Sequence, residues 1–220
     1  MDDWEKLLSA ERHIQQLVPG SVLVGGTAAA LHARHRVSLD ADHVVGDLRE
    51  RFDEVLSDLE AAAGWRTNRV QRPVLILGQI SGMLTGIRQL RRVRPLETVT
   101  IEGLRVPTLA EMARIKLWLL ATRNTVRDYL DSVVLMELLG PAAARKAVKE
   151  FDVIYEQPTG TSPLSEAIER LSSALPTDAA AVNLEQYRGL HAPWNNWSYL
   201  MQRGRYWGPV LAEELLRGEG

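Results

Sequence analysis

Two aspartates separated by one residue, Asp40 and Asp42, lie in the stretch SLDADHVV, whose alternating pattern predicts a strand. Residues two apart in a strand share a face, so the two carboxylates are expected side by side, where they repel each other unless a cation lies between them. Mg²⁺ prefers carboxylate oxygens and also binds triphosphate oxygens. The pair therefore predicts a Mg²⁺ site. For the Asp-x-Asp pattern taken alone, the alternative is a solvated edge strand.

A glycine turn precedes the two aspartates. The stretch SVLVGG predicts a short buried strand that ends at Gly25 and Gly26, and Thr27 opens a predicted helix, TAAALHAR. Backbone N–H groups at such a turn favour an anionic phosphate, and the Thr27 hydroxyl is a further donor. A tight strand-to-helix turn without a ligand is the alternative for the glycines alone. Together, the turn and the two acids predict a site for a nucleoside triphosphate (NTP) and Mg²⁺.

The stretch GGTAAALHARHRVSLDADHVV, residues 25–45, resembles the first motif of the DNA polymerase β-like nucleotidyltransferase superfamily. More narrowly, it is similar to the AbiEii toxin-like branch, which includes the mycobacterial MenT-type toxins. In that branch a Lys…Arg…Arg-Asp-x-x-Asp pattern follows in a helical region, and residues 114–131 here read RIKLWLLATRNTVRDYLD. The resemblance covers about residues 20–140. It implies transfer of a nucleoside monophosphate (NMP) from an NTP to an acceptor hydroxyl, at a tRNA 3′ end, by a toxin paired with an antitoxin.

Lys116 and Arg123 interrupt an otherwise apolar stripe of a predicted helix. A lysine in such a stripe is costly unless it is paired or its head group reaches water, so a surface-edge lysine is one interpretation. The resemblance implies the other, in which Lys116 contacts the triphosphate, Asp128 belongs to the active site and orients Lys116, and Arg123 binds nucleotide. For Asp128 and Asp131 the alternative is charge complementarity with the start of the next predicted helix.

Ser38 precedes Asp40 by two residues and is expected on the same face of the predicted strand, as a further nucleotide-site residue. A phosphate on Ser38 would add about −1.5 to −2 charges beside the metal ligands. The resemblance implies such a modification, since some toxins of the branch are switched off at the matching serine. A structural hydroxyl at the start of the strand is the alternative.

The superfamily often has a third acidic residue on a later strand, and this sequence lacks an evident one. The candidate strand, VLILGQIS, carries Gln79, which has no charge, while Glu97 and Glu102 are possible substitutes without a compelling spacing. Two carboxylates can hold one Mg²⁺ whose coordination is completed by phosphate oxygens and water. We therefore expect either a two-acid active site or impaired chemistry.

A basic cluster follows this strand, with four arginines within seven residues: Arg88, Arg91, Arg92 and Arg94. Such a cluster can bind RNA phosphates even on a chain of net charge −2, and it is predicted to face the RNA; a solvated surface is the alternative. Two further hypotheses remain open. The acceptor could be a small molecule, as for antibiotic nucleotidyltransferases, or the fold could be a non-catalytic nucleotide- or protein-binding module.

The elements that must position these residues form two predicted domains. Residues 1–107 alternate helices and strands and then continue in strands, which predicts an α/β or α+β nucleotidyltransferase-type domain with a mixed sheet. Residues 108–220 predict a helical domain that completes the active-site cleft. The 220-residue chain has no cysteine, which excludes disulfides, thiolate zinc sites and cysteine nucleophiles. With no long apolar run and no apolar signal core, we expect a cytoplasmic protein without a membrane span.

Overall fold

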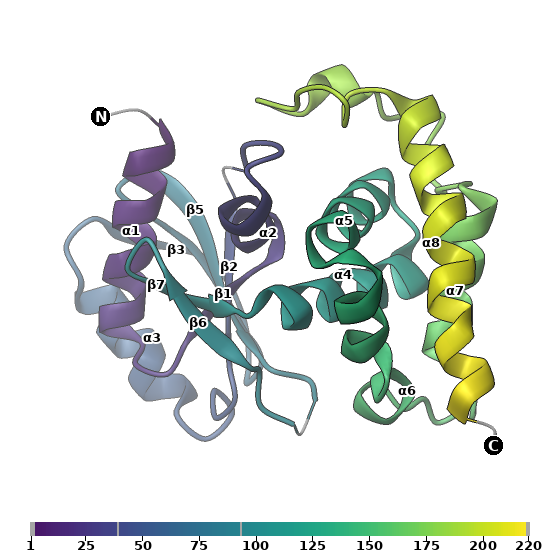
Figure 1. Ribbon diagram of the computed structural model, residues 1–220. Coiled ribbons are helices and arrows are strands. Elements are labelled where there is room, and N and C mark those ends of the chain that lie inside the picture. Colours follow the sequence, from purple (N-terminus) through teal and green to yellow (C-terminus); the bar gives the residue numbers. More distant parts are fainter. Residues whose placement is uncertain (1–2, 39, 93, 219–220) are drawn as a thin grey trace. The chain divides into compact units, whose positions relative to one another are not determined.

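A computed structural model describes residues 3–38, 40–92 and 94–218, and it has the predicted α+β class (Figure 1). The chain divides into two compact units. The first comprises Met1–Leu31 and Ser38–Thr108, and the second comprises His32–Val37 and Leu109–Gly220. The sequence placed the division between residues 107 and 108. The second unit therefore also takes in a short segment that lies just before Asp40 in the chain.

A mixed five-stranded sheet forms the centre of the first unit. Its order is β1 (Val22–Val24), β2 (Ala41–Val45), β5 (Met83–Gln89), β4 (Leu75–Ile80) and β3 (Trp65–Gln71). β2 and β5 are parallel, and the other neighbouring pairs are antiparallel. No strand was predicted over residues 83–89, where Gly82 and Gly86 permit tight turns. The site depends on this strand, since β5 is the neighbour of the strand that carries Asp42.

Helices α1 (Asp3–Leu17) and α3 (Phe52–Ala61) pack against one face of this sheet (Figure 1). Their apolar side chains, such as Ile14 and Leu59, form a core with Ile76 and Ile87 of the strands. On the same side, buried Glu11 of α1 accepts hydrogen bonds from Thr85 and pairs with His43. Since neighbouring residues of a strand point to opposite faces, burial of His43 against α1 directs Asp42 to the other face.

The remaining elements of the first unit lie at its edges. Helix α2 (Gly25–Ala33) begins directly after β1, so the strand-to-helix turn has no intervening loop. A hairpin of β6 (Thr98–Ile101) and β7 (Leu104–Pro107) forms a separate two-stranded sheet. Glu102 and Gly103 make its turn, and both have a positive φ.

The second unit is helical. Its elements are α4 (Leu109–Arg123), α5 (Val126–Val148), α6 (Phe151–Ile154), α7 (Pro163–Ser173), a 3₁₀ turn (Leu184–Gln186) and α8 (Trp197–Gly218). Thr125 caps α5 by accepting a hydrogen bond from the Asp128 backbone N–H, and Ser162 caps α7 in the same way. Helix α5 is kinked at Gly140, which has a positive φ of 71° and is followed by Pro141.

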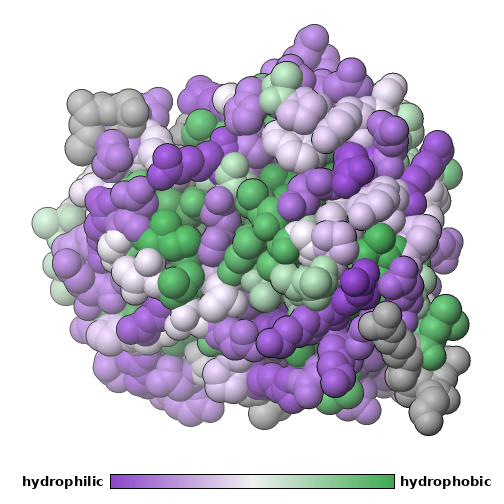
Figure 2. Space-filling view, viewed as in Figure 1, coloured by the Kyte–Doolittle hydropathy of each residue, from purple (hydrophilic) through white to green (hydrophobic). Residues whose placement is uncertain are grey.

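Polar and aromatic contacts hold α8 in this unit. The indole N–H of Trp207 and the Nε of Arg203 both donate to Glu137 Oε1 of α5, each at 2.6 Å. None of the helices in the described part of the chain is long and apolar enough to cross a bilayer. On the face that Figure 2 shows, hydrophilic side chains predominate and hydrophobic ones gather in a few groups.

Candidate functional site

Asp42 lies on the sheet face that α1 and α3 leave uncovered. It is the second residue of β2, paired with Val24 of β1 on one side and with Gly86 of β5 on the other. Its side chain is 39% exposed, so the carboxylate reaches solvent. A carboxylate that is held by two neighbouring strands and open to water can take a ligand without rearrangement of the core.

Two glycines make room for this carboxylate. A Cβ added at Gly25 would lie 3.8 Å from Asp42 Oδ2, and one added at Gly86 would lie 2.9 Å from Asp42 Oδ1. The second distance is shorter than real Cβ contacts, as is the distance of 2.8 Å to Leu77 Cδ2, so a side chain at Gly86 would displace both Asp42 and Leu77. Gly25 has a positive φ of 75° and is the first residue of α2. The acid and the phosphate-type turn are therefore direct neighbours.

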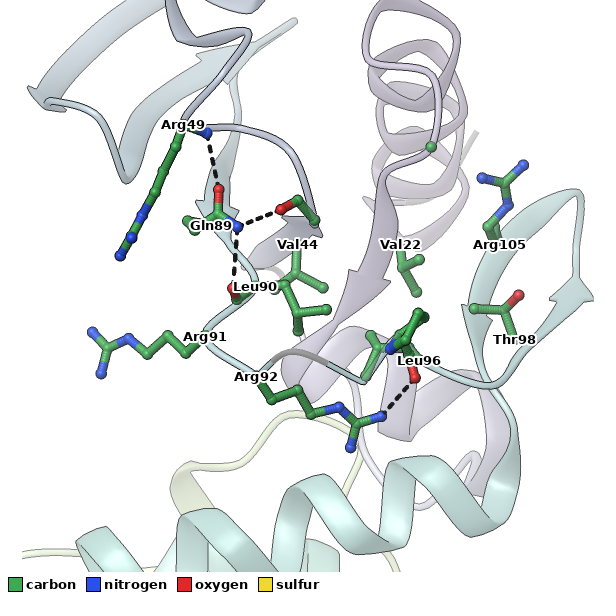
Figure 3. Close-up of a pocket in the computed structure, with 13 residues that line it drawn as sticks. Val22, Val44, Arg49, Gln89, Leu90, Arg91, Arg92, Leu96, Thr98 and Arg105 are labelled. Carbon is green, nitrogen blue, oxygen red and sulfur yellow. Dashed lines mark hydrogen bonds between the residues drawn. The ribbon is translucent and has the colours of Figure 1, made fainter. Parts of the chain in front are cut away.

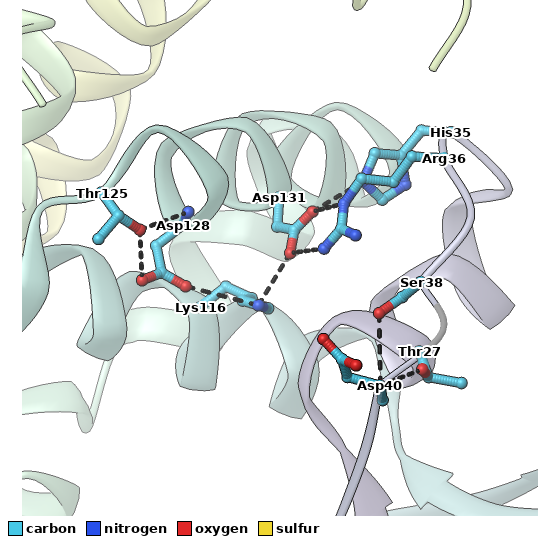
Figure 4. Close-up of polar contacts among 9 residues, drawn as sticks. All are labelled: Thr27, His35, Arg36, Ser38, Asp40, Lys116, Thr125, Asp128 and Asp131. Atoms are coloured by element: carbon cyan, nitrogen blue, oxygen red, sulfur yellow. Dashed lines mark hydrogen bonds and ion pairs between the residues drawn. The ribbon is translucent and has the colours of Figure 1, made fainter. Parts of the chain in front are cut away.

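Asp40 lies just before β2 and is exposed. Its backbone carbonyl accepts hydrogen bonds from Thr27 Oγ1 at 2.7 Å and from Ser38 Oγ at 3.3 Å. Figure 4 shows the Asp40 carboxylate directed away from the Thr27 hydroxyl. Thr27 is fully buried, and its hydroxyl fixes the chain at Asp40, while the expected contact with phosphate stays a prediction. Ser38 is also buried and makes the structural hydrogen bond that was the alternative interpretation.

Arg88 of β5 forms an ion pair with Asp42. Its Nε donates to Asp42 Oδ1 at 2.8 Å, and the two side chains are 45% and 39% exposed. The pairing directs Arg88 to the metal-site candidate, whereas the sequence prediction grouped it with the RNA-facing arginines. An exposed ion pair of this kind is worth about 0–1 kcal/mol, so a divalent cation can displace it at little cost.

The donor set suits one divalent cation. Asp40 and Asp42 offer hard carboxylate oxygens, and both residues are accessible to solvent. In the part of the chain that the structure describes, no cluster of three or more His, Asp or Glu side chains has the geometry of a metal site. Gln79 lies on β4, Glu102 lies in the hairpin turn, and Glu97 precedes β6. Asp40 and Asp42 are therefore the two carboxylates that would hold a Mg²⁺ at this site.

In the helical unit, Lys116 lies in a buried cluster of charges (Figure 4). Its Nζ is 2.8 Å from Asp131 Oδ2 and 3.5 Å from Asp128 Oδ1, and its side chain is only 2% exposed. The Thr125 hydroxyl donates to Asp128 Oδ2, so the start of α5 fixes this carboxylate. Lys116 is thus a buried, paired lysine, which differs from the surface-edge interpretation.

Asp131 is the centre of this cluster. Arg36 donates to both of its carboxylate oxygens, at 2.9 and 2.8 Å, and His35 Nε2 lies 2.8 Å from Oδ1. Burial alone would raise the pKa of Asp131, but the charges of Lys116 and Arg36 and the hydrogen bonds of His35 and Arg36 hold it well below its usual value. Asp131 is therefore a buried carboxylate that stays ionised.

Three residues of this cluster, His35, Arg36 and Asp131, were not among the predicted site residues. His35 and Arg36 belong to His32–Val37, the segment that falls within the helical unit, and Ser38 follows it directly in the chain. The only signal in the sequence was the position of Asp131, three residues after Asp128 and hence on the same helix face. Arg123, the remaining nucleotide-binding candidate of this unit, is exposed at the end of α4.

No protein-family model matches this sequence, and no curated protein matches it. The fold itself is that of nucleotidyltransferase structures. The Helicobacter pylori protein JHP933 is 17% identical with a TM-score of 0.56, over 99% of this chain and 94% of its own. A proposed nucleotidyltransferase from H. pylori is 18% identical with a TM-score of 0.56, over 99% and 97%. The antibiotic-resistance factor ANT(2″)-Ia is 13% identical with a TM-score of 0.52, over 69% and 94%. At these identities the likeness establishes the fold.

Proposed function

We propose that the protein is a Mg²⁺-dependent nucleotidyltransferase that moves NMP from an NTP to a hydroxyl at the 3′ end of a tRNA, as the toxin of a toxin–antitoxin system. The observation that supports the reaction best is the position of the Asp42 carboxylate, 3.8 Å from the Cβ that Gly25 lacks. This proximity joins an exposed metal-type acid to the N-terminus of a nine-residue helix, where backbone N–H groups and the helix dipole favour phosphate.

The first unit would bind the reacting part of the NTP. Gly25 and Gly26 would hold the β- and γ-phosphates through their backbone N–H groups, while Asp40 and Asp42 would hold Mg²⁺. A Mg²⁺ ion held by these two carboxylates would lower the pKa of the acceptor hydroxyl and stabilise charge on the α-phosphate. The acceptor oxygen then bonds to the α-phosphorus, the bond to the pyrophosphate oxygen breaks, and the hydroxyl proton passes to solvent. Thr27 and Ser38 would support this site by fixing the backbone of Asp40.

The helical unit would contribute cations. The resemblance assigns Lys116 the neutralisation of charge on the leaving pyrophosphate, Asp128 the orientation of Lys116, and Arg123 a contact to the nucleotide. The ion pairs of Lys116 with Asp128 and Asp131 support a lysine held in one orientation, which a positioning role requires.

The acceptor is the part of the proposal with two candidates. Arg91, Arg92 and Arg94 offer positive charge for RNA phosphates, which favours tRNA, while Arg88 is engaged by Asp42. A small-molecule acceptor is the second candidate, because ANT(2″)-Ia, which has the same fold, is an antibiotic-resistance factor.

The test is an incubation of the purified protein with Mg²⁺, each labelled NTP in turn and total tRNA. We expect label to enter RNA with one NTP, and to be absent for Asp40→Ala. Label in a small acceptor but not in RNA would favour the second candidate. Retained NTP binding with no transfer from any of the four NTPs would mean a non-catalytic binding module and would refute the enzyme.

A methyl group at Gly86 is expected to disturb the metal site without unfolding the unit. In Gly86→Ala, the new Cβ would lie 2.9 Å from Asp42 Oδ1 and 2.8 Å from Leu77 Cδ2, so both flexible side chains must move. We expect Mn²⁺, a spin-active substitute for Mg²⁺, to bind at least about tenfold more weakly in a titration followed by electron paramagnetic resonance, which is about 1.4 kcal/mol. Gly46→Ala, with no atom within 4 Å of its added Cβ, is the matched control. Wild-type Mn²⁺ affinity in Gly86→Ala would contradict the placement of the cation at Asp42.

Removal of the Arg88 charge is expected to have the opposite effect on the cation. Since Arg88 competes for Asp42 Oδ1 through an exposed ion pair, Arg88→Gln should tighten Mn²⁺ binding by about two- to fivefold. Arg69→Gln, an exposed arginine of β3, is the control and should leave the affinity unchanged. Weaker Mn²⁺ binding in Arg88→Gln would show that Arg88 does not oppose the cation.

A further inference from the structure

The first unit contains a cavity of about 850 Å³ on the same sheet face as Asp42 (Figure 3). It is bounded by β1, β2, the segment after β5 and the β6–β7 hairpin. Val22 and Val44 line the cavity and pair with each other across β1 and β2. This pair lies two residues along the strands from the pair of Val24 and Asp42. A strand rises about 3.3 Å per residue, so the backbone at Val44 lies roughly 7 Å from that at Asp42.

Arginines dominate the charge of this cavity. Arg49, Arg91, Arg92 and Arg105 line it, and none of its described lining residues is acidic. Figure 3 shows Arg49 and Arg91 on one side and Arg105 on the other. The Arg92 guanidinium donates to the backbone carbonyls of Arg94 and Pro95, so it holds the segment after β5 in shape.

The other three guanidinium groups differ from that of Arg92, because no described residue forms an ion pair with them. Among the residues that the structure describes, Arg49, Arg91 and Arg105 form no ion pair through their side chains, and all three are exposed. They come from three separate elements, since Arg49 follows β2, Arg91 follows β5 and Arg105 lies on β7. Positive charges that line one cavity without a carboxylate repel one another, and a bound polyanion reduces that repulsion.

The shape and the apolar part of the cavity indicate the kind of polyanion. Aliphatic side chains, including Val22, Val44, Leu90 and Leu96, line the cavity between the arginines, and its volume is near the upper end for small-molecule sites. A single-stranded nucleic acid has flat bases that pack on apolar surface and evenly spaced phosphates that pair with arginines.

We infer that this arginine cavity (Arg49, Arg91 and Arg105 around Val22 and Val44) binds the phosphodiester backbone of the acceptor RNA close to its 3′ end. The inference rests on the proposed function, which requires an RNA hydroxyl at Asp42. It replaces the predicted surface of four arginines within seven residues with three arginines from different parts of the unit, of which Arg49 and Arg105 had no signal in the sequence.

The test is RNA binding without catalysis. Fluorescence anisotropy of a labelled single-stranded RNA oligonucleotide is measured in EDTA without NTP, for the wild type and for the triple variant Arg49→Ala/Arg91→Ala/Arg105→Ala. Three phosphate contacts give a log–log salt slope of about −2 for a single strand. We expect this slope for the wild type, a slope near zero for the triple variant, and at least about tenfold weaker binding at low salt. The control Arg66→Ala/Arg69→Ala, on the edge strand β3, should bind as the wild type does.

Two outcomes would overturn the inference, and a third measurement separates it from the proposed function. Wild-type affinity and slope in the triple variant would refute the cavity as an RNA site, even if transfer to RNA occurs. Equal loss of inorganic triphosphate and RNA binding would identify a phosphate site for free nucleotides, and would also refute it. Asp42→Asn should lose NMP transfer and keep RNA binding, which shows that the two measurements are independent. A wild type that binds RNA through the arginines but transfers no NMP would therefore contradict the proposed function and leave the RNA site intact.

Discussion

Asp42→Asn is expected to lower the rate of NMP transfer by about a thousandfold or more. The neutral amide is a poorer Mg²⁺ ligand than a carboxylate, a catalytic cation supplies several kcal/mol of transition-state stabilisation, and about 1.4 kcal/mol corresponds to a tenfold change in rate. The fold should persist, because the variant removes only an exposed ion pair with Arg88, worth about 0–1 kcal/mol. The measurement combines the initial rate of label transfer with thermal melting followed by circular dichroism.

Asp58→Asn is the matched control for this experiment. Asp58 is an exposed residue of α3, so the variant makes the same change of charge on the covered side of the sheet. It should retain the wild-type rate. A rate for Asp42→Asn within tenfold of the wild type, with the fold intact, would remove Asp42 from the chemistry.

Asp131→Asn is expected to cost about 3–5 kcal/mol in the free energy of unfolding, since it leaves the buried charges of Arg36 and Lys116 without their main partner. Urea unfolding followed by tryptophan fluorescence reports mainly on the helical unit, which contains four of the six tryptophans: Trp118, Trp194, Trp197 and Trp207. Glu169→Gln, an exposed residue of α7, is the control and should change the stability by less than about 0.5 kcal/mol.

The stability loss of Asp131→Asn should depend on pH with a definite sign. The folded-state pKa of Asp131 lies well below the usual value, so its contribution is complete above the unfolded-state pKa, about 4, and disappears as the pH falls through the folded-state pKa. We expect the gap between the wild type and Asp131→Asn to be constant near neutral pH and to narrow below about pH 4. Adding Lys116→Met should restore part of the loss, because it removes an orphaned charge. A gap that widens in acid would contradict an ionised Asp131.

The local part of the site could be predicted from the sequence. The glycines at 25 and 26, the short helix and the strand that carries Asp42 follow from hydrophobic pattern and turn chemistry, which act over a few residues. The predicted α+β class is confirmed. Asp40 is less regular, since it lies before the first residue of β2, where strand alternation does not fix the direction of a side chain.

The strand β5 could not be predicted because Gly86, in its middle, is compatible with either a turn or a strand. A glycine within a strand pattern marks either a turn or a close approach, and the sequence does not show that Gly86 lies against Asp42. Because β5 was missed, β4 was the candidate strand for a third acid, and its polar position is Gln79. The parallel neighbour of β2 is β5 rather than β4, and the β5 residues beside Asp42, Gly86 and Arg88, are not acidic.

The buried cluster around Lys116 depends on contacts that the sequence does not encode locally. Arg36 and Asp131 are 95 residues apart, and His35 and Asp131 are 96 apart. The apolar stripe of α4 indicated that Lys116 needs a partner, but it did not identify Asp131. Likewise, the burial of Thr27 and its hydrogen bond to the Asp40 carbonyl follow from packing, which the sequence does not show.

The most direct test of the central claim is a crystal structure with Mn²⁺ and a non-hydrolysable NTP, read from the anomalous signal of the metal. We expect a cation about 2.0–2.2 Å from carboxylate oxygens of both Asp40 and Asp42, with Arg88 moved off Asp42 and the β- and γ-phosphates at the N–H groups of Gly25 and Gly26. A cation bound by other groups, or the two carboxylates on opposite faces with the triphosphate away from the glycine turn, would contradict it.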